Sequence, residues 1–173
     1  MILNKDFFAR DALEVAPDLV GKRIVRILPD GTRLEAIISE TEAYRGAEDT
    51  ACHASKGRTP RTELLFGEAG IIYVYLCYGM HWLMNVITGE KEQPQGVLIR
   101  AARDFSGPAK LTKHLKIDGS FNGKPIYGDP EIFIEETDIV PEIITLPRVG
   151  INYATPEYRD IPWRFADKSF LKK

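Results

Sequence analysis

The residues most able to do chemistry lie in segment 40–44, which reads Glu-Thr-Glu-Ala-Tyr. In a regular β-strand, its first, third and fifth residues point to one face. The same parity upstream carries apolar side chains, and these are Leu34, Ala36 and Ile38. An apolar face would therefore lead directly into the two carboxylates and the phenol. A carboxylate at the edge of a core-facing surface is a candidate for a raised pKa and hence for acid–base catalysis.

Strand-forming residues and turn signals predict the elements that must hold this segment. Residues 23–28 and the segment from Arg33 onward form a predicted hairpin, because Asp30-Gly31 between them is a strong turn signal. Residues 70–78 are mostly β-branched and aromatic, which predicts a strand buried on both faces. Further strands are predicted at 82–88, 96–101, 132–135 and 148–151.

Capping residues predict short helices between the strands. They cover residues 12–19, with an interruption near Pro17, residues 59–66, and a segment that follows Ser106 as its N-cap. Residues 45–58 form a predicted loop. There is no regular alternation of strands and helices of the kind that builds a parallel sheet. The sequence therefore predicts an α+β fold with a mostly antiparallel sheet.

The composition is that of an ordinary globular protein. With 44% hydrophobic and 28% charged residues, we expect residues 1–173 to form a single domain. The net charge of −2 shows no basic excess, so binding to nucleic acid would need a local basic patch. Cys52 and Cys77 form no CxxC pair and are expected to be free thiols. The N-terminal segment has no apolar run long enough for a signal peptide or a membrane span, so we expect a cytoplasmic protein.

Two other functions fit parts of the sequence. A metal-dependent hydrolase could draw its ligands from Glu40, Glu42, His53 and His81, although the histidines have no HExxH-like spacing and His114 lies on a predicted helix elsewhere. A binding module without catalysis could use the tyrosines of 70–78 as a stacking platform. A stoichiometric bound metal would favour the first, and full function of a Glu42→Gln variant would favour the second.

An ordered set of motifs resembles the alkyladenine (3-methylpurine) DNA glycosylase family. Segment 40–44 is followed by Tyr-Val-Tyr-Leu-Cys-Tyr-Gly-Met at 73–80, by Asn85 and by Val-Leu-Ile-Arg-Ala at 97–101. The set is completed by His53, Arg-Thr-Pro-Arg at 58–61, Ser-Gly-Pro-Ala-Lys-Leu at 106–111 and Arg-Val-Gly-Ile at 148–151. The resemblance extends from Phe7 to Phe165 and implies a single domain with a curved antiparallel sheet.

The resemblance implies hydrolysis of the N-glycosidic bond of a damaged purine that is rotated out of the DNA duplex. The implied substrates are 3-methyladenine, 7-methylguanine, hypoxanthine and ethenoadenine. Glu42 matches the residue that takes a proton from water and offsets the positive charge that develops on the sugar. Arg100 matches its partner in holding this water, and the main-chain carbonyl of Val149 matches a third ligand. A purely structural ion pair between Glu42 and Arg100 is the alternative.

Other residues match the family's binding positions. Tyr44, His53 and Tyr75 match the walls of an aromatic slot that attracts cationic purines. Asn85 matches an asparagine whose amide clashes with the amino group of normal guanine. Tyr78 matches a wedge that enters the minor groove and fills the gap left by the extruded base. Without the resemblance, Tyr75 and Tyr78 would be interpreted as ordinary core tyrosines.

The stretch from His53 to Arg61 is the best local basic patch. Arg58, Thr59 and Arg61 are its candidates for contacts to DNA phosphates, and a solvated charged loop is the alternative for each. No lysine matches a Schiff-base nucleophile, so we expect base release without strand cleavage. We expect no cofactor, a monomer, and damaged double-stranded DNA as the partner. The short connection from Arg100 to Ser106, where larger members carry an insertion, predicts fewer DNA contacts or an altered substrate range.

Overall fold

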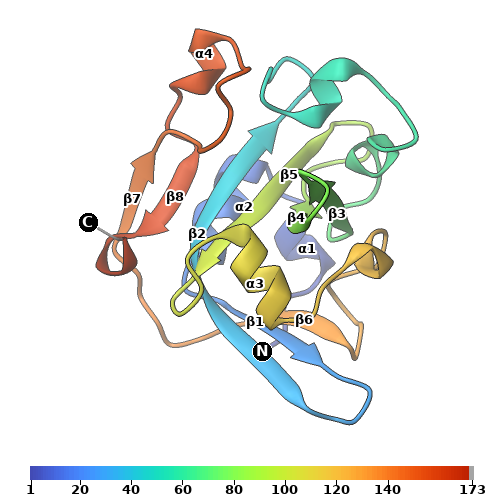
Figure 1. Cartoon of the computed structure of the whole chain (residues 1–173), viewed down its shortest axis with the longest axis vertical. Helices are drawn as coiled ribbons and strands as arrows, with labels where there is room; N and C mark the ends of the chain where they lie inside the picture. The colour runs from blue at the N-terminus through green and yellow to red at the C-terminus, as the bar shows by residue number, and fades with distance from the viewer. Residues whose placement is uncertain (172–173) are drawn as a thin grey trace.

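A curled antiparallel sheet forms most of the fold, and a computed structural model describes residues 1–171 (Figure 1). The sheet follows the order β3-β4-β5-β2-β1-β6, with β8 paired to β2 and β7 paired to β8. The described pairings are all antiparallel, which confirms the predicted α+β class. The strands are β1 Arg23–Ile27, β2 Arg33–Arg45, β3 Ile72–Cys77, β4 His81–Ile87, β5 Gln95–Ala102, β6 Ile132–Glu135, β7 Ile143–Leu146 and β8 Arg164–Asp167.

The helices are short, and two of them pack on the central strands. Helix α2 packs on β2 and β5, whereas α3 packs on β4 and β5 (Figure 1). The α-helices are α1 Lys5–Phe8, α2 Ala12–Leu19, α3 Pro108–His114 and α4 Pro156–Arg159. Single turns of 3-10 helix lie at His53–Lys56, Glu63–Phe66, Gly119–Phe121 and Lys168–Phe170.

Turn and cap signals predicted some element boundaries and missed others. The first hairpin is confirmed, because Ile27 pairs with Arg33 around the predicted turn. Helix α2 has the predicted bounds, but Pro17 lies within it and does not interrupt it. The helix predicted for residues 59–66 forms only as the 3-10 turn Glu63–Phe66, and the N-cap of α3 is Gly107, not Ser106.

The strand predicted at 148–151 is wrong. These residues form a loop, and the strand that pairs with β8 on the side away from β2 is β7, which ends two residues before Arg148. The reason is visible at Arg148, whose buried side chain donates to the main-chain carbonyls of Ala43 and Tyr158. The next two residues also leave the strand conformation, because the Val149 amide donates to Glu42 Oε2 and Gly150 has a φ of 75°.

The core-facing parity changes within β2, so the regular alternation expected from Leu34 to Tyr44 is wrong. Ile38 lies in the hydrophobic core, but further along the odd-numbered Thr41 and Ala43 turn inward. The Thr41 hydroxyl donates to the carbonyl of Ala16 in α2 over 2.6 Å. The pairing with β5 is irregular around Glu40, where β2 also exchanges β1 for β8 as its other neighbour. A bulge at this point turns the later even-numbered residues away from the core.

In β5, the parity of the core-facing residues changes at the positions paired with the irregular part of β2. Ile99 and Ala102 both lie in the core, so the inward positions pass from odd to even. The strands remain paired on both sides, with Ile38 opposite Ala102 and Thr41 opposite Ile99. The even-numbered residues after Glu40 in β2 and before Ala102 in β5 therefore share the face opposite the core.

Candidate active site

Four adjacent strands place one residue each in a row across the face opposite the core. Glu42 of β2 lies opposite Leu98 of β5. Leu98 also lies opposite Asn85 of β4, and Asn85 lies opposite Tyr73 of β3. Because side chains alternate along a strand, positions two residues away extend the same face. These positions hold Tyr44, Tyr75 and Arg100.

A cavity of about 510 Å³ lies over this face. Strands β2, β3, β4 and β5, the β3–β4 turn, the loop 149–153, the start of α3 and two side chains of segment 53–61 enclose it. The cavity brings together most of the residues singled out in the sequence, namely Glu42, Tyr44, His53, Arg61, Tyr75, Tyr78, Arg100 and Val149. Three of them are absent from its lining, namely Arg58, Thr59 and Asn85.

Glu42 is buried and held by two hydrogen-bond donors. Only 1% of the surface of Glu42 is exposed to solvent. The Tyr44 hydroxyl donates to Oε1 over 2.9 Å, and the Val149 amide donates to Oε2 over 2.7 Å. Burial raises the pKa of the Glu42 carboxyl, whereas the Val149 amide, Arg100 and the Tyr44 hydroxyl act to lower that pKa. Burial also raises the pKa of Tyr44 well above its usual value, so its hydroxyl stays protonated as a donor.

Arg100 faces the same cavity but makes its ion pair with Glu40. Its Nε lies 3.6 Å from Glu40 Oε2, and Arg164 Nη1 lies 3.2 Å from the same oxygen. Within residues 1–171, no ion pair joins Arg100 to Glu42 directly, although both side chains line the cavity. The positive charge still favours the ionised form of Glu42.

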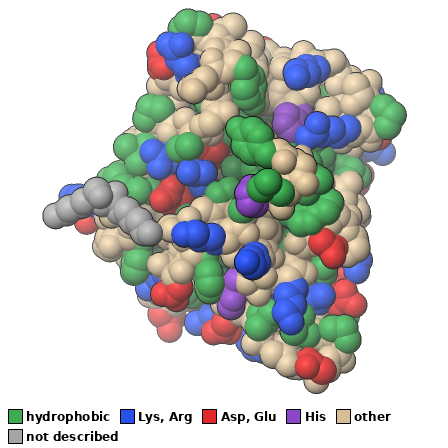
Figure 2. Space-filling model, in the orientation of Figure 1, with side chains coloured by type: hydrophobic (Ala, Val, Ile, Leu, Met, Phe, Trp, Pro, Cys, Tyr) green, Lys and Arg blue, Asp and Glu red, His purple; other side chains and the backbone are tan. Residues whose placement is uncertain are grey.

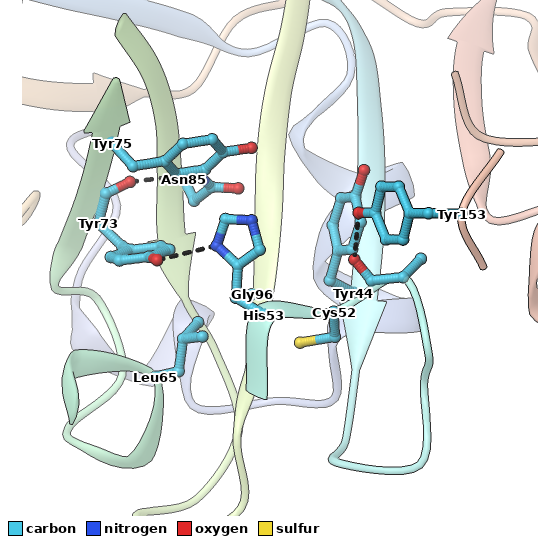
Figure 3. A pocket seen from close by; sticks show the side chains of 10 residues that line it. Tyr44, Cys52, His53, Leu65, Tyr73, Tyr75, Asn85, Gly96 and Tyr153 are labelled. Carbon is cyan, nitrogen blue, oxygen red and sulfur yellow. Dashed lines mark hydrogen bonds between the residues drawn. The ribbon is translucent and has the colours of Figure 1, made fainter. Parts of the chain in front are cut away.

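Aromatic rings face one another in a smaller chamber that shares part of its lining with the cavity. Figure 3 shows Tyr73 and Tyr75 on one side, Tyr44 and Tyr153 on the other, and His53 between them. His53 packs edge-on against Tyr75 with ring centroids 4.6 Å apart, and its Nδ1 lies 2.9 Å from the Tyr73 hydroxyl. Burial, with Arg61 and Lys56 nearby, lowers the pKa of His53 to about 4, so the imidazole is neutral at pH 7.

Asn85 lies in a smaller chamber of about 40 Å³ that shares four aromatic walls with the main cavity (Figure 3). Its side chain is buried, and its Nδ2 donates to the Tyr73 carbonyl over 3.2 Å. The amide is therefore anchored through nitrogen. A group that enters the chamber would meet the amide in a fixed orientation.

Tyr78 projects from the turn between β3 and β4. It is 88% exposed and has a φ of 53°, a left-handed conformation that is unusual for a residue with a Cβ. Met80 and Leu76 beside it are also exposed. Figure 2 shows hydrophobic side chains gathered near the middle of this face, with Lys and Arg side chains around them.

The predicted burial of residues 70–78 on both faces is therefore correct only for the first half of β3. Residues 72–74 are buried, whereas Leu76 is exposed. β3 is the end strand of the sheet order, and segment 122–124 covers its outer edge only at the first half, through hydrogen bonds to Ile72 and Val74.

The basic patch is divided by its ion pairs. Arg58 contacts Glu63 and Glu92 through several hydrogen bonds, so two carboxylates already surround its charge. Arg61 instead lies exposed at the cavity, with its guanidinium 5.3 Å from the centre of the Tyr75 ring. Thr59 lies away from the cavity, and its amide donates to the Thr62 hydroxyl over 2.8 Å.

Sequence patterns missed two parts of the site. Tyr153 lines both cavities and donates its hydroxyl to the Ala51 carbonyl over 3.0 Å, but no spacing distinguishes this loop tyrosine from others. Asp49 and Arg148 form a fully buried ion pair behind the site. Arg148 begins the Arg-Val-Gly-Ile motif, so its position was marked, although its partner was not.

The metal-ligand set considered from the sequence does not gather in space. Within residues 1–171, no group of three or more His, Cys, Asp or Glu side chains could hold a metal ion. Glu42 and His53 instead make the hydrogen bonds described above. Among the described helices, none is both long and apolar enough to cross a membrane.

Known proteins resemble the chain over nearly its whole length. The family model described as methylpurine-DNA glycosylase matches residues 6–105 and 102–170. A protein of Clostridium botulinum is 42% identical, with full coverage of both chains. A protein of Methanocella arvoryzae is 40% identical and covers 97% of this chain and 93% of its own. One of Anaeromyxobacter dehalogenans is 44% identical and covers 96% and 83%. All three carry the provisional name 3-methyladenine DNA glycosylase.

Proposed function

The chain belongs to the methylpurine-DNA glycosylase family, and on this premise we propose that it hydrolyses the N-glycosidic bond of damaged purines with Glu42 as the base that activates water. The observation that supports this assignment is the environment of Glu42. A buried carboxylate, held at both oxygens, lies on the wall of a cavity that aromatic rings also line. A carboxylate fixed in this way can accept a proton without first reorganising.

Hydrolysis requires the ionised form of Glu42. The reaction develops positive charge on the sugar, and the carboxylate both offsets this charge and takes the proton from the attacking water. We propose that the water lies between Glu42 and Arg100, with the Val149 carbonyl as a third ligand. Since burial raises the Glu42 pKa, the carboxylate is present above this raised pKa. Activity should therefore fall as the pH falls through it.

The aromatic walls would bind the extruded base. We propose that Tyr44, His53 and Tyr75 form the slot, because an alkylated purine often carries positive charge that is attracted to π faces. The neutral state of His53 avoids repulsion of such a cation. The anchored amide of Asn85 would oppose the exocyclic amino group of normal guanine and so favour damaged bases.

The exposed surface around the cavity would contact the DNA. We propose that Tyr78 enters the base stack where the purine leaves it, because its turn already presents the ring to solvent. Arg61, beside Tyr75, and Thr59 would contact phosphates, and Arg58 would do so by exchanging its two glutamates for a phosphate. We further propose that residues 1–173 act as one domain and as a monomer.

We propose that substrates include 3-methyladenine, 7-methylguanine, hypoxanthine and ethenoadenine, and that no cofactor is needed. The reaction should release the base and leave the backbone intact, because no lysine lines the cavity to form a Schiff base. The cavity lining lies within the described residues, and Arg61 and Arg100 are its only basic side chains besides the histidines.

A set of lesion-bearing duplexes tests the proposal. Duplexes with one hypoxanthine or ethenoadenine should lose this base without added cofactor, and strand breaks should appear only after hot alkali. Glu42→Gln should lower the single-turnover rate by orders of magnitude and still bind the duplex. Glu35→Gln is the matched control, because Glu35 lies on the same strand but is exposed and away from the cavity. Full activity of Glu42→Gln would contradict the proposed base.

A further inference from the structure

Behind the cavity wall, Arg148 and Asp49 form a bidentate ion pair. Nη1 lies 2.7 Å from Oδ2 and Nη2 lies 3.0 Å from Oδ1, with both side chains 0% exposed. The Asp49 oxygens also accept the amides of Arg45 and Ala51, each over 3.0 Å. Neither Arg148 nor Asp49 lines the cavity. Burial of two charges is costly and is weak evidence for a role in stability alone, so the contacts of the pair are of interest.

The first contact of the pair is between Arg148 and Tyr44. The Arg148 guanidinium lies 4.8 Å from the centre of the Tyr44 ring, and Trp163 lies on the guanidinium at 5.2 Å. Nη1 also donates to the carbonyl of Ala43 over 3.0 Å. Arg148 therefore contacts both the ring of Tyr44 and the peptide group that precedes it. The hydroxyl of this ring is the donor to Glu42 Oε1.

Arg148 is also connected through the main chain to Val149, the second donor to Glu42. The amide that donates to Glu42 Oε2 belongs to Val149 and is bonded directly to the carbonyl carbon of Arg148. Asp49 and the Tyr158 carbonyl hold both Nη atoms of Arg148 and thereby fix the start of this loop. The position of the Val149 amide thus depends on the same buried side chain as the Tyr44 ring.

We propose that the Arg148–Asp49 pair is the positioning element of the water-activating carboxylate, because it holds in place both groups that donate to Glu42. The proposal rests on the function proposed above and assigns Arg148 and Asp49 no contact with the substrate. Because donors to a carboxylate stabilise its ionised form, loss of the pair should make Glu42 harder to ionise and less well oriented.

Other groups around Glu42 also affect its ionisation, and the test must hold them constant. Tyr44 of β2, Arg100 of β5 and Arg148 lower the Glu42 pKa, whereas Tyr75 of β3 and Tyr153 of the loop face Glu42 as neutral phenols. Only Arg148 among them is changed in the experiment. Arg148 also attracts Glu42 through its own charge, so a variant that keeps a positive charge is needed to separate charge from position.

The experiment measures single-turnover release of hypoxanthine from duplex DNA between pH 5 and pH 9 for the whole chain. Arg148→Met removes the pair, and Arg148→Lys keeps the charge but cannot form the planar bidentate contact. Asp49→Asn/Arg148→Met removes both buried charges, which limits the loss of stability. Arg45→Met is the matched control, because Arg45 lies on the same strand as Glu42 but pairs with Asp11 and is absent from the cavity lining.

We expect Arg148→Met and the double variant to move the acidic limb of the rate profile upward by about one pH unit. At pH values on the acidic limb, below the pKa of Glu42 in both proteins, their rates should fall about tenfold, the loss that corresponds to one unit on this scale. Affinity for the lesion duplex should change less than the rate. Arg148→Lys should restore only part of the loss, whereas the limb of Arg45→Met should coincide with that of the wild type.

A purely structural role gives a different result. Melting temperatures and active fractions would fall, but the acidic limb would keep its position, and this outcome would overturn the proposal. If Arg148→Met alone does not fold, the double variant and Arg148→Lys decide in the same way. Failure of the proposed function is distinguishable, because the wild type would then release no base or Glu42→Gln would match it.

Discussion

Removing one hydroxyl from Tyr44 should move the pH dependence of catalysis. Tyr44→Phe keeps the ring that lines the cavity and deletes only the donor that lies 2.9 Å from Glu42 Oε1. A hydrogen bond to a charged group contributes about 1.5–3 kcal/mol. Since one pKa unit corresponds to about 1.4 kcal/mol, the loss corresponds to roughly one to two units.

The sign of this change is fixed by the form that the bond stabilises. The hydroxyl favours the ionised carboxylate, so its removal raises the Glu42 pKa further above the usual value. The active carboxylate exists above this pKa and is lost as the pH falls through it. The acidic limb of the variant should therefore lie at higher pH, and its rate should approach that of the wild type in alkaline solution.

The assay is single-turnover base release from a hypoxanthine duplex, with rates fitted across pH 5 to pH 9. Tyr153→Phe is a matched control, because it deletes a tyrosine hydroxyl in the same cavity that donates to the Ala51 carbonyl and not to Glu42. A Tyr44→Phe limb that coincides with the wild-type limb would refute the assignment of this hydroxyl as a determinant of Glu42 ionisation.

Three further outcomes follow from the site. Tyr78→Ala should lower the rate on duplex DNA about tenfold or more, with little change on single-stranded DNA. Equal rates of the variant and the wild type on duplex DNA would contradict the assignment of Tyr78 as the wedge. Arg61→Ala should reduce the slope of log affinity against log salt by about 0.9, whereas Arg58→Ala should reduce it less because two glutamates already neutralise that charge. Unfolding titrations between pH 6.5 and pH 4 should show that the wild type loses about 2 kcal/mol more stability than His53→Gln. The reason is that His53 becomes protonated in the unfolded state over this range, whereas the buried imidazole of the folded state has a pKa of about 4 and stays largely neutral. An identical loss in both proteins would contradict the neutral assignment of His53.

Local signals in the sequence sufficed for the fold class and for part of the site. The Asp30-Gly31 turn and the alternation after it placed a hairpin correctly, and Glu42 and Tyr44 do share a face. Two residues with this spacing on any strand point the same way, so this prediction needed no knowledge of tertiary contacts.

What could not be predicted depends on partners that are distant in the chain. The change of parity near Glu40 arises where β2 exchanges one neighbouring strand for another, and nothing in segment 38–41 signals this exchange. The burial of Glu42 comes from a loop more than a hundred residues later, whose Val149 amide covers it. The partner of Arg148 in a buried ion pair is likewise set by packing, not by local pattern.

The matched irregularities in β2 and β5 limit how these strands can change length. Two residues separate the inward Ile38 from Thr41, and two separate Ile99 from Ala102 on the opposite strand. A deletion of one residue in only one of these intervals would shift the register of all later β2–β5 pairs by one residue, and Glu42 would no longer lie opposite Leu98. Insertions and deletions at this point can therefore be tolerated only as compensating pairs, one in each strand.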